Sequence, residues 1–368
     1  MRFGLIGCGD IGQLRANALT QTRGAVLVSV SDIDAQKAKL TATRFHTQTD
    51  RDWTTLLERS DIDAVIVSTP PRLHIDMCVA AMEAGKHVLC EKPLARTPEE
   101  CRLILATAER TGKRIATGFN YRFYPSFVRA REILESGRIG ELDHVRSYGG
   151  YSATSHNQPW VHDAATVGGG ALRDIGIHLI DLTRDFLGEV AEVVGMASSD
   201  VWKYPGCEDN GFALLRSTSG RIAALHASWT EWRRYQFLIE LYGTRGCIRA
   251  SCFPMMTQAV WANQTGGRTR RRTDWFPGVA VGEKLRSYRW VVVRSFIEEF
   301  AAFSAFVHGQ PSRIATGFDG MRAIEIANMA AAGLPDAVHD DDAGRGGGTG
   351  PVASRDADDA NRTGAPHT

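Results

Sequence analysis

The first 34 residues constrain the fold of this chain more than any other stretch. An apolar run over residues 3–6 leads directly into Gly7-Cys8-Gly9-Asp10-Ile11-Gly12, and a second apolar run over residues 26–30 ends at Ser31-Asp32. Between them, residues 13–19 have the composition of a helix. This order of strand, glycine-rich turn, helix, strand and acid is typical of a dinucleotide-binding βαβ unit. The start of such a helix offers free N–H groups and a partial positive charge to phosphates.

Each glycine of the turn has its own expected role. Gly7 allows the tight turn, Gly9 lets the backbone approach a pyrophosphate, and Gly12 lets the helix pack closely on the strand. Asp32 lies about 20 residues past the last glycine, where a carboxylate is expected to bind the ribose hydroxyls. A carboxylate there repels a 2′-phosphate, and no arginine directly follows Asp32. The sequence therefore favours NAD over NADP, whereas an unrelated glycine-rich turn would leave Asp32 unexplained.

Strand and helix signals alternate as far as about residue 120. A continuous apolar run predicts a buried strand over residues 64–68, and two further strands are predicted over residues 86–90 and 114–118. The segment Thr97-Pro98-Glu99-Glu100 predicts a helix start, with a cap, a first-position proline and acids in the first turn. We therefore expect residues 1–120 to form an α/β Rossmann domain with a doubly wound parallel sheet.

The pattern changes beyond residue 120. Strand-like runs follow one another closely, and helices are predicted over residues 171–187, 295–307 and 319–332. This predicts an α+β domain with a largely antiparallel sheet over residues 121–334. The final segment, residues 335–368, has almost no large apolar residues and is predicted to be disordered. The expected strands cover residues 142–151, 190–197, 212–217, 222–229, 237–242 and 257–262.

Composition excludes several classes of partner. The formal net charge of +1 gives no field for nucleic acid or an anionic membrane. No apolar run approaches the ~20 residues of a membrane helix, and the chain opens on a strand without room for a signal peptide. The seven cysteines are scattered without a C-x-x-C pair. We expect reduced thiols in a cytoplasmic protein with no metal site.

Lys92 is the first candidate for chemistry, because it follows the predicted strand over residues 86–90. Ligands of open α/β sheets bind at the carboxyl ends of the strands. A lysine there can stabilise negative charge on a substrate oxygen. Position alone leaves open a surface lysine paired with Glu91.

A second candidate set lies on the predicted helix over residues 171–187. Asp174, His178 and Asp181 are spaced four and three residues apart, so they share one face. A histidine beside carboxylates can act as a general base whose tautomer is fixed by an acid. A structural histidine in the core is an equal alternative, while a two-ligand metal half-site lacks a third ligand.

Four motifs occur in order: Gly7-Cys8-Gly9-Asp10-Ile11-Gly12, Thr69-Pro70-Pro71-Arg72-Leu73-His74, Glu91-Lys92-Pro93-Leu94, and the segment over residues 168–181. Together they resemble the Gfo/Idh/MocA family, which includes glucose–fructose oxidoreductase and inositol 2-dehydrogenase. The likeness covers residues 1 to about 330. The segment after about residue 332 resembles nothing in the family.

The resemblance implies a Rossmann domain, a second domain whose sheet often makes subunit contacts, and catalysis by Lys92 with an Asp174–His178 acid/base pair. It also implies that Thr69, Pro70 and His74 lie beside the cofactor, and that Asn120 and Arg122 border the nicotinamide and substrate. The expected cofactor-binding residues are Gly7, Gly9, Asp10, Ile11, Gly12, Asp32, Thr69, Pro70, His74, Glu91, Lys92, Asn120 and Arg122.

The expected activity is NAD(H)-dependent interconversion of a secondary alcohol and a ketone on a cyclic polyol or sugar, by a homodimer or homotetramer. The basic run Arg268–Arg272 is expected to be a solvated loop. One alternative to the expected activity is a nucleotide-sugar ketoreductase, in which this run would clamp a substrate phosphate. Another is a non-catalytic dinucleotide-binding sensor of the same fold. The aromatic residues Trp229, Trp232 and Tyr235 are expected in a core or interface, with a sugar platform as the alternative.

Overall fold

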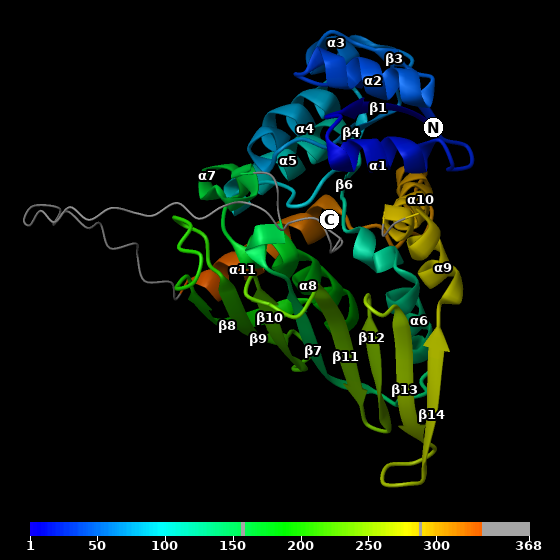
Figure 1. Cartoon of the computed structure of the whole chain (residues 1–368), viewed down its shortest axis with the longest axis vertical. Helices are drawn as coiled ribbons and strands as arrows, with labels where there is room; N and C mark the ends of the chain where they lie inside the picture. The colour runs from blue at the N-terminus through cyan, green and yellow to red at the C-terminus, as the bar shows by residue number, and fades with distance from the viewer. Residues whose placement is uncertain (156–158, 287–288, 333–368) are drawn as a thin grey trace, which may run out of the picture.

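The computed structural model describes residues 1–155, 159–286 and 289–332, so the predicted disordered tail lies outside the described residues. The described chain forms two regions, each built on one sheet (Figure 1). Among these residues no helix combines the length and apolar character that a membrane crossing requires.

The first region is a six-stranded parallel sheet in the order β3-β2-β1-β4-β5-β6. All four residues of β4 are fully buried, because helices cover both faces of this sheet. Thr97 caps α5 through its side chain and Pro98 takes the first helical position. The expected doubly wound fold is confirmed. Its elements are β1 (Arg2–Ile6), α1 (Asp10–Leu19), β2 (Val26–Ser31), α2 (Ala35–Phe45), β3 (Gln48–Thr49), α3 (Trp53–Glu58), β4 (Ala64–Val67), α4 (His74–Glu83), β5 (His87–Cys90), α5 (Pro98–Thr111) and β6 (Ile115–Thr117).

The second region is an eight-stranded sheet in the order β14-β13-β12-β11-β7-β10-β9-β8. Neighbouring strands run antiparallel except β7 and β10, which are parallel. The expected α+β region is confirmed. Its elements are α6 (Pro125–Glu135), β7 (Leu142–Gly150), α7 (Ala164–Val167), α8 (Ala171–Leu187), β8 (Val190–Ser198), β9 (Asn210–Ser217), β10 (Ile222–Ser228), β11 (Gln236–Gly243), β12 (Gly246–Ser251), β13 (Met256–Ala262), β14 (Thr269–Trp275), α9 (Pro277–Arg286), α10 (Arg289–Val307) and α11 (Gly317–Ala331). Short 3-10 segments span Pro71–Leu73, Asn120–Phe123, Ala153–Ser155 and Pro159–His162.

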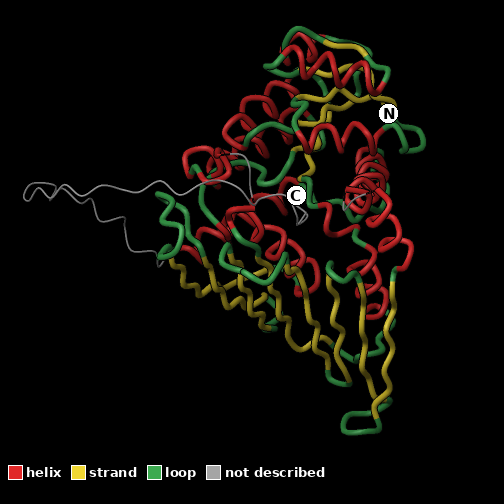
Figure 2. The backbone as a smooth tube through the Cα atoms, in the orientation of Figure 1, coloured by secondary structure: helices red, strands yellow, loops and turns green. Residues whose placement is uncertain are grey.

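Helices cover only one face of the second sheet (Figure 2). α8 packs on β7 and β10, α11 on β8, and α6 on β12 and β13. Helix α8 has the predicted bounds, and 15 of its 17 residues are buried, so both of its sides are packed. It lies between its own sheet and the first region (Figure 1).

The run Arg268–Arg272 is solvent-exposed as predicted, but most of it is a strand and not a loop. Residues 269–275 form β14, the edge strand of the second sheet, which pairs with β13. The run lacks alternating apolar residues because nearly all of its side chains are exposed. Charged side chains on an exposed edge strand also oppose edge-to-edge aggregation.

Other elements were missed for related reasons. The short strand β12 and the helices α6 and α9 have no separate prediction, and α10 begins at residue 289 and not at 295. Helix α10 returns to the first region and packs against α1. Phe300 makes an edge contact with Phe3, with ring centroids 5.7 Å apart. The C-terminal helices therefore complete the core of the first region.

Candidate functional site

The glycine turn between β1 and α1 has the geometry that a dinucleotide requires. Gly7 has φ +95°, and a Cβ there would lie 2.3 Å from the Ser68 carbonyl oxygen. A Cβ on Gly12 would lie 2.0 Å from the Gly7 carbonyl oxygen. A Cβ on Gly9 would meet nothing within 4 Å, so the space over this residue is open to a ligand.

Helix α1 begins at Asp10, which is followed by Ile11, and its N-cap residue Gly9 makes no side-chain capping bond. The first-turn N–H groups are thus free of a side-chain cap, as phosphate binding at a helix start requires. Asp32 accepts hydrogen bonds from the backbone N–H of Cys8 (2.6 Å) and of Asp34 (2.8 Å). These residues fit a dinucleotide, with the phosphates at α1 and the ribose at Asp32.

The loop after β4 is held by His74. Its ring nitrogens lie 2.8 Å from the Thr69 carbonyl oxygen and 2.9 Å from the Pro93 carbonyl oxygen. The side chain is fully buried, and burial lowers the pKa of His74. The His74 ring therefore connects the Thr69-Pro70 loop to the segment after β5. If this loop borders the cofactor as expected, His74 would support the loop.

The structure brings Lys92 and Asp174 together from positions 82 residues apart. Lys92 Nζ donates to Asp174 Oδ1 and to the Asp174 carbonyl oxygen, each at 3.2 Å. The Lys92 side chain is 23% exposed. Glu91 instead pairs with Arg15 of α1, with Nε and Oε1 2.5 Å apart. A surface lysine paired with Glu91 does not describe this geometry.

His178 lies one turn beyond Asp174 on α8 and is buried. Its Nδ1 has no hydrogen-bond partner among the described residues, so no carboxylate fixes its tautomer through that atom. Burial and the nearby Lys92 ammonium hold the pKa of His178 well below its usual range. The ring packs against Tyr121, with centroids 4.4 Å apart. Both effects favour the neutral imidazole, which is the form that a general base needs before it accepts a proton.

Asp181, on the same helix, belongs to a different set of contacts. Arg122 donates from Nε (2.8 Å) and Nη2 (2.5 Å) to its two carboxylate oxygens. Burial raises the pKa of Asp181 to about 6, although Arg122 opposes the shift. Asn120 donates to Ser295 of α10 at 3.0 Å. Contact of Asn120 and Arg122 with the cofactor stays a prediction, since both side chains have protein partners.

Two residues that support the site were missed by sequence reasoning. Trp229 is fully buried, and its Nε1 donates to Asp174 Oδ2 at 3.1 Å. Glu208 accepts from the backbone N–H groups of Gly170 (2.9 Å) and Leu172 (2.7 Å), so it caps α8. The core interpretation is confirmed for Trp229 and the buried Tyr235, while Trp232 is 67% exposed. No spacing in the sequence indicates these long-range contacts.

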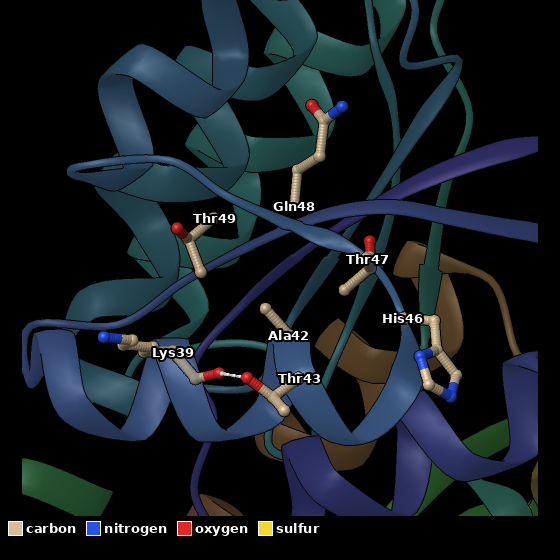
Figure 3. Close-up of a pocket in the computed structure, with 7 residues that line it drawn as sticks. All are labelled: Lys39, Ala42, Thr43, His46, Thr47, Gln48 and Thr49. Carbon is tan, nitrogen blue, oxygen red and sulfur yellow. Dashed lines mark hydrogen bonds between the residues drawn. The ribbon is translucent and has the colours of Figure 1, made fainter.

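A shallow pocket elsewhere contains none of the predicted site residues. It lies along α2 and the edge strand β3 (Figure 3). Three strands of the sheet separate β3 from β5, the strand that leads to Lys92. The described residues contain no group of three or more His, Cys, Asp or Glu side chains placed to hold a metal ion. The pocket is lined by Lys39, Ala42, Thr43, His46, Thr47, Gln48 and Thr49.

Comparison with known proteins agrees with this fold. The chain is 32% identical to an inositol 2-dehydrogenase of Rhizobium meliloti over 68% of its length and 75% of that protein. It is 33% identical to dTDP-3,4-didehydro-2,6-dideoxy-alpha-D-glucose 3-reductase of Saccharopolyspora spinosa over 71% of its length and 78% of that protein. A solved structure of levoglucosan dehydrogenase with NADH and levoglucosan superposes with a TM-score of 0.78 at 25% identity, covering 90% of this chain and 97% of the other.

Two family descriptions match this sequence, each over a different part of the chain. Residues 1–119 match the oxidoreductase family with an NAD-binding Rossmann fold. Residues 127–249 match the GFO/IDH/MocA C-terminal domain. The chain therefore belongs to the Gfo/Idh/MocA oxidoreductase family and carries its NAD-binding Rossmann domain.

Proposed function

We propose that this protein transfers a hydride between NAD and a secondary alcohol or ketone carbon of a cyclic polyol or sugar. The observation that carries the proposal is the Lys92–Asp174 pair beside a neutral His178, at the strand ends next to the glycine turn. Inositol, levoglucosan and anhydrofructose enzymes among the relatives support this substrate class.

In the oxidative direction, His178 accepts the hydroxyl proton. Its lowered pKa keeps it unprotonated near neutral pH, as a base must be. The Lys92 ammonium stabilises negative charge that develops on the substrate oxygen. Bound NAD supplies the hydride acceptor. In the reduction of the ketone, protonated His178 gives its proton to the substrate oxygen, and Lys92 stays an ammonium that stabilises the developing negative charge.

Asp174 has a different position from the one expected. It holds Lys92 through Oδ1 and is itself held by Trp229 through Oδ2. We infer that Asp174 acts mainly by orienting the ammonium of Lys92. Orientation of His178 by Asp174 stays a prediction that no contact at His178 Nδ1 supports.

Reduction of a nucleotide-linked keto sugar is the second candidate, since one relative is named for that substrate. Within one chain, the position of the basic run Arg268–Arg272 does not support this second candidate. β14 is the far edge of the second sheet, four strands from β7, which packs on α8 (Figure 1). A non-catalytic sensor would not need Lys92, Asp174 and His178 together.

The test is fluorescence of bound NADH against NADPH, followed by absorbance assays with inositols, free sugars and nucleotide sugars. We expect tight NADH binding and turnover on a polyol or free sugar. Turnover on nucleotide sugars alone would favour the second candidate. Binding without any turnover would favour the sensor, and no cofactor binding would contradict the role of the glycine turn.

We also infer that the protein is a homodimer or homotetramer formed through the open face of the second sheet. Five large apolar side chains there are 51–74% exposed, on the adjacent strands β8, β9 and β10. A contiguous apolar patch on an otherwise folded surface marks an interaction site. The seven cysteines are free, which supports the proposed cytoplasmic location. The five side chains are Val194, Met196, Phe212, Leu214 and Ile222.

A further inference from the structure

The most unusual group outside the residues that would touch substrate is the buried guanidinium of Arg15. Arg15 lies on α1 and is fully buried. Its Nε pairs with Glu91 at 2.5 Å, and its Nη1 pairs with Glu299 of α10. Its guanidinium also stacks over the Phe296 ring, 4.0 Å from the centroid. One arginine thus joins three segments that are far apart in the sequence.

The surrounding backbone leaves room for this side chain at one position. A Cβ on Gly118 would lie 2.4 Å from Arg15 Nη2. Gly118 also donates its N–H to the Cys90 carbonyl oxygen at 2.8 Å, next to Glu91. The guanidinium is therefore enclosed by the end of β5, the turn after β6, and α10.

Glu91 continues the contact toward the reacting groups. Its Oε1 accepts a hydrogen bond from Arg15 Nε. Its Oε2 accepts a second hydrogen bond from the backbone N–H of Lys92, with nitrogen and oxygen 3.3 Å apart. The next link is Lys92 Nζ to Asp174. An unbroken series of polar contacts therefore runs from the helix that starts the phosphate site to the lysine that would meet the substrate oxygen.

We propose that Arg15 is a positioning residue, whose planar fork holds Glu91 and so fixes the backbone of Lys92 relative to the cofactor helix α1. The inference rests on the proposed function for its effect on turnover, while its effect on Lys92 itself is independent of any substrate. Lysine cannot reproduce the role, because an ammonium lacks the fixed fork that meets two carboxylates at once.

The chain offers a matched control in Arg184. This arginine is also buried, and it pairs with Asp319 (3.1 Å) and Glu189 (2.6 Å), but it lies beyond the site on α8. Arg15→Lys and Arg184→Lys each remove one buried fork between two carboxylates, so a purely structural role predicts similar consequences for both.

The primary readout is the rate at which acetic anhydride acetylates Lys92, followed by peptide mass spectrometry with the exposed Lys37 as internal reference. We expect Arg15→Lys to raise the rate at least threefold and Arg184→Lys to leave it unchanged. With substrate, Arg15→Lys should lower kcat at least tenfold while KM and NADH affinity change less than threefold. Equal rates and equal kcat in the two variants would overturn the proposal.

Glu91→Gln covers the case in which Arg15→Lys does not fold. The glutamine oxygen still accepts from Arg15, but its amide faces the Lys92 N–H as a second donor, so this hydrogen bond is lost. We expect faster acetylation of Lys92 again, and an unchanged rate would count against the proposal. If the acetylation pattern holds while wild-type protein turns over no polyol or sugar, the proposed function fails and the positioning role stands.

Discussion

The two sheets of this protein expose their residues in opposite ways. The parallel sheet is buried on both faces, and the polar residues Asp32, Thr69 and Lys92 of the predicted site follow the ends of its strands. The second sheet is covered on one face and leaves apolar side chains open on the other. The covered face supports α8, which carries Asp174 and His178 to the strand ends of the first sheet.

This difference separates two tasks in space. The proposed chemistry lies where the ends of buried strands meet α8, and the proposed self-association uses the far face of the second sheet. Changes in one place should leave the other intact. The expected effects below range from the largest, at the strand ends, to the smallest, on the open face.

Replacement Lys92→Met tests the first half of the comparison. It removes the cation that is proposed to meet the substrate oxygen, while the side chain stays unbranched and only one atom shorter. We expect kcat to fall about 1000-fold, or about 4 kcal/mol of transition-state stabilisation. NADH fluorescence should give an affinity near that of the wild type. The exposed Lys37→Met serves as control, and full activity of the Lys92 variant would refute the assignment.

The helix α10 provides a pH-dependent test of how the second region completes the first. Burial and the neighbouring Glu91 raise the pKa of Glu299 to about 7, although Arg15 opposes the shift, and Asp181 adds a weaker upward effect. The folded protein therefore holds a proton that the unfolded chain releases near pH 4.5. The resulting stability is present below pH 4.5 and is lost as the pH rises through 7.

Replacement Glu299→Gln should remove this dependence, because the amide keeps an acceptor for Arg15 without titrating. Between pH 4.5 and pH 8, the free energy of unfolding of the wild type should change by about 3 kcal/mol relative to that of the variant. Urea unfolding at several pH values measures it. We expect the stability of wild type relative to the variant to decrease with rising pH. A constant difference across that range would show that Glu299 does not titrate there.

The fold was largely predictable because the first region repeats a strong local pattern. The central strand β4 is a continuous apolar run, and the bounds of α8 follow from Gly170 before it and Gly188 after it. β14 was missed because an edge strand exposed on both faces carries no apolar alternation, and three of its seven residues are arginines. Local pattern therefore fails where burial does not impose it.

The site was predictable only in part. Glycine spacing predicts the dinucleotide turn, and the position of Lys92 at a strand end makes it a candidate. Lys92 and Asp174 are 82 residues apart in the sequence, so their contact depends on how the two regions pack. Only the family resemblance predicted that these residues belong to one site. Arg15 and Trp229 were not found as supports, because their partners lie 76 and 55 residues away in the sequence.

Cofactor choice at the strand ends gives a smaller expected effect. Replacement Asp32→Asn keeps the shape of the side chain and removes the charge that would repel a 2′-phosphate. We expect the preference for NADH over NADPH to fall about tenfold, or about 1.4 kcal/mol. Paired fluorescence titrations measure it. The control is Asp34→Asn, a nearby carboxylate that caps α2; an equal effect of both variants would mean that only the general charge matters.

The open face of the second sheet should give the smallest effect on chemistry. Leu214 pairs in register with Val194, and the Phe212 ring stacks on His226 with centroids 3.8 Å apart, so charge placed here disrupts one continuous surface. We expect Phe212→Lys/Leu214→Lys to lower the mass measured by light scattering, while Leu103→Lys on α5, also an exposed apolar position, leaves it unchanged. NADH affinity should stay within twofold of wild type, because the second sheet and α8 lie between this face and Lys92. If the double variant keeps the wild-type mass, the interface lies elsewhere; if it loses NADH binding as well, the separation of the two tasks is wrong.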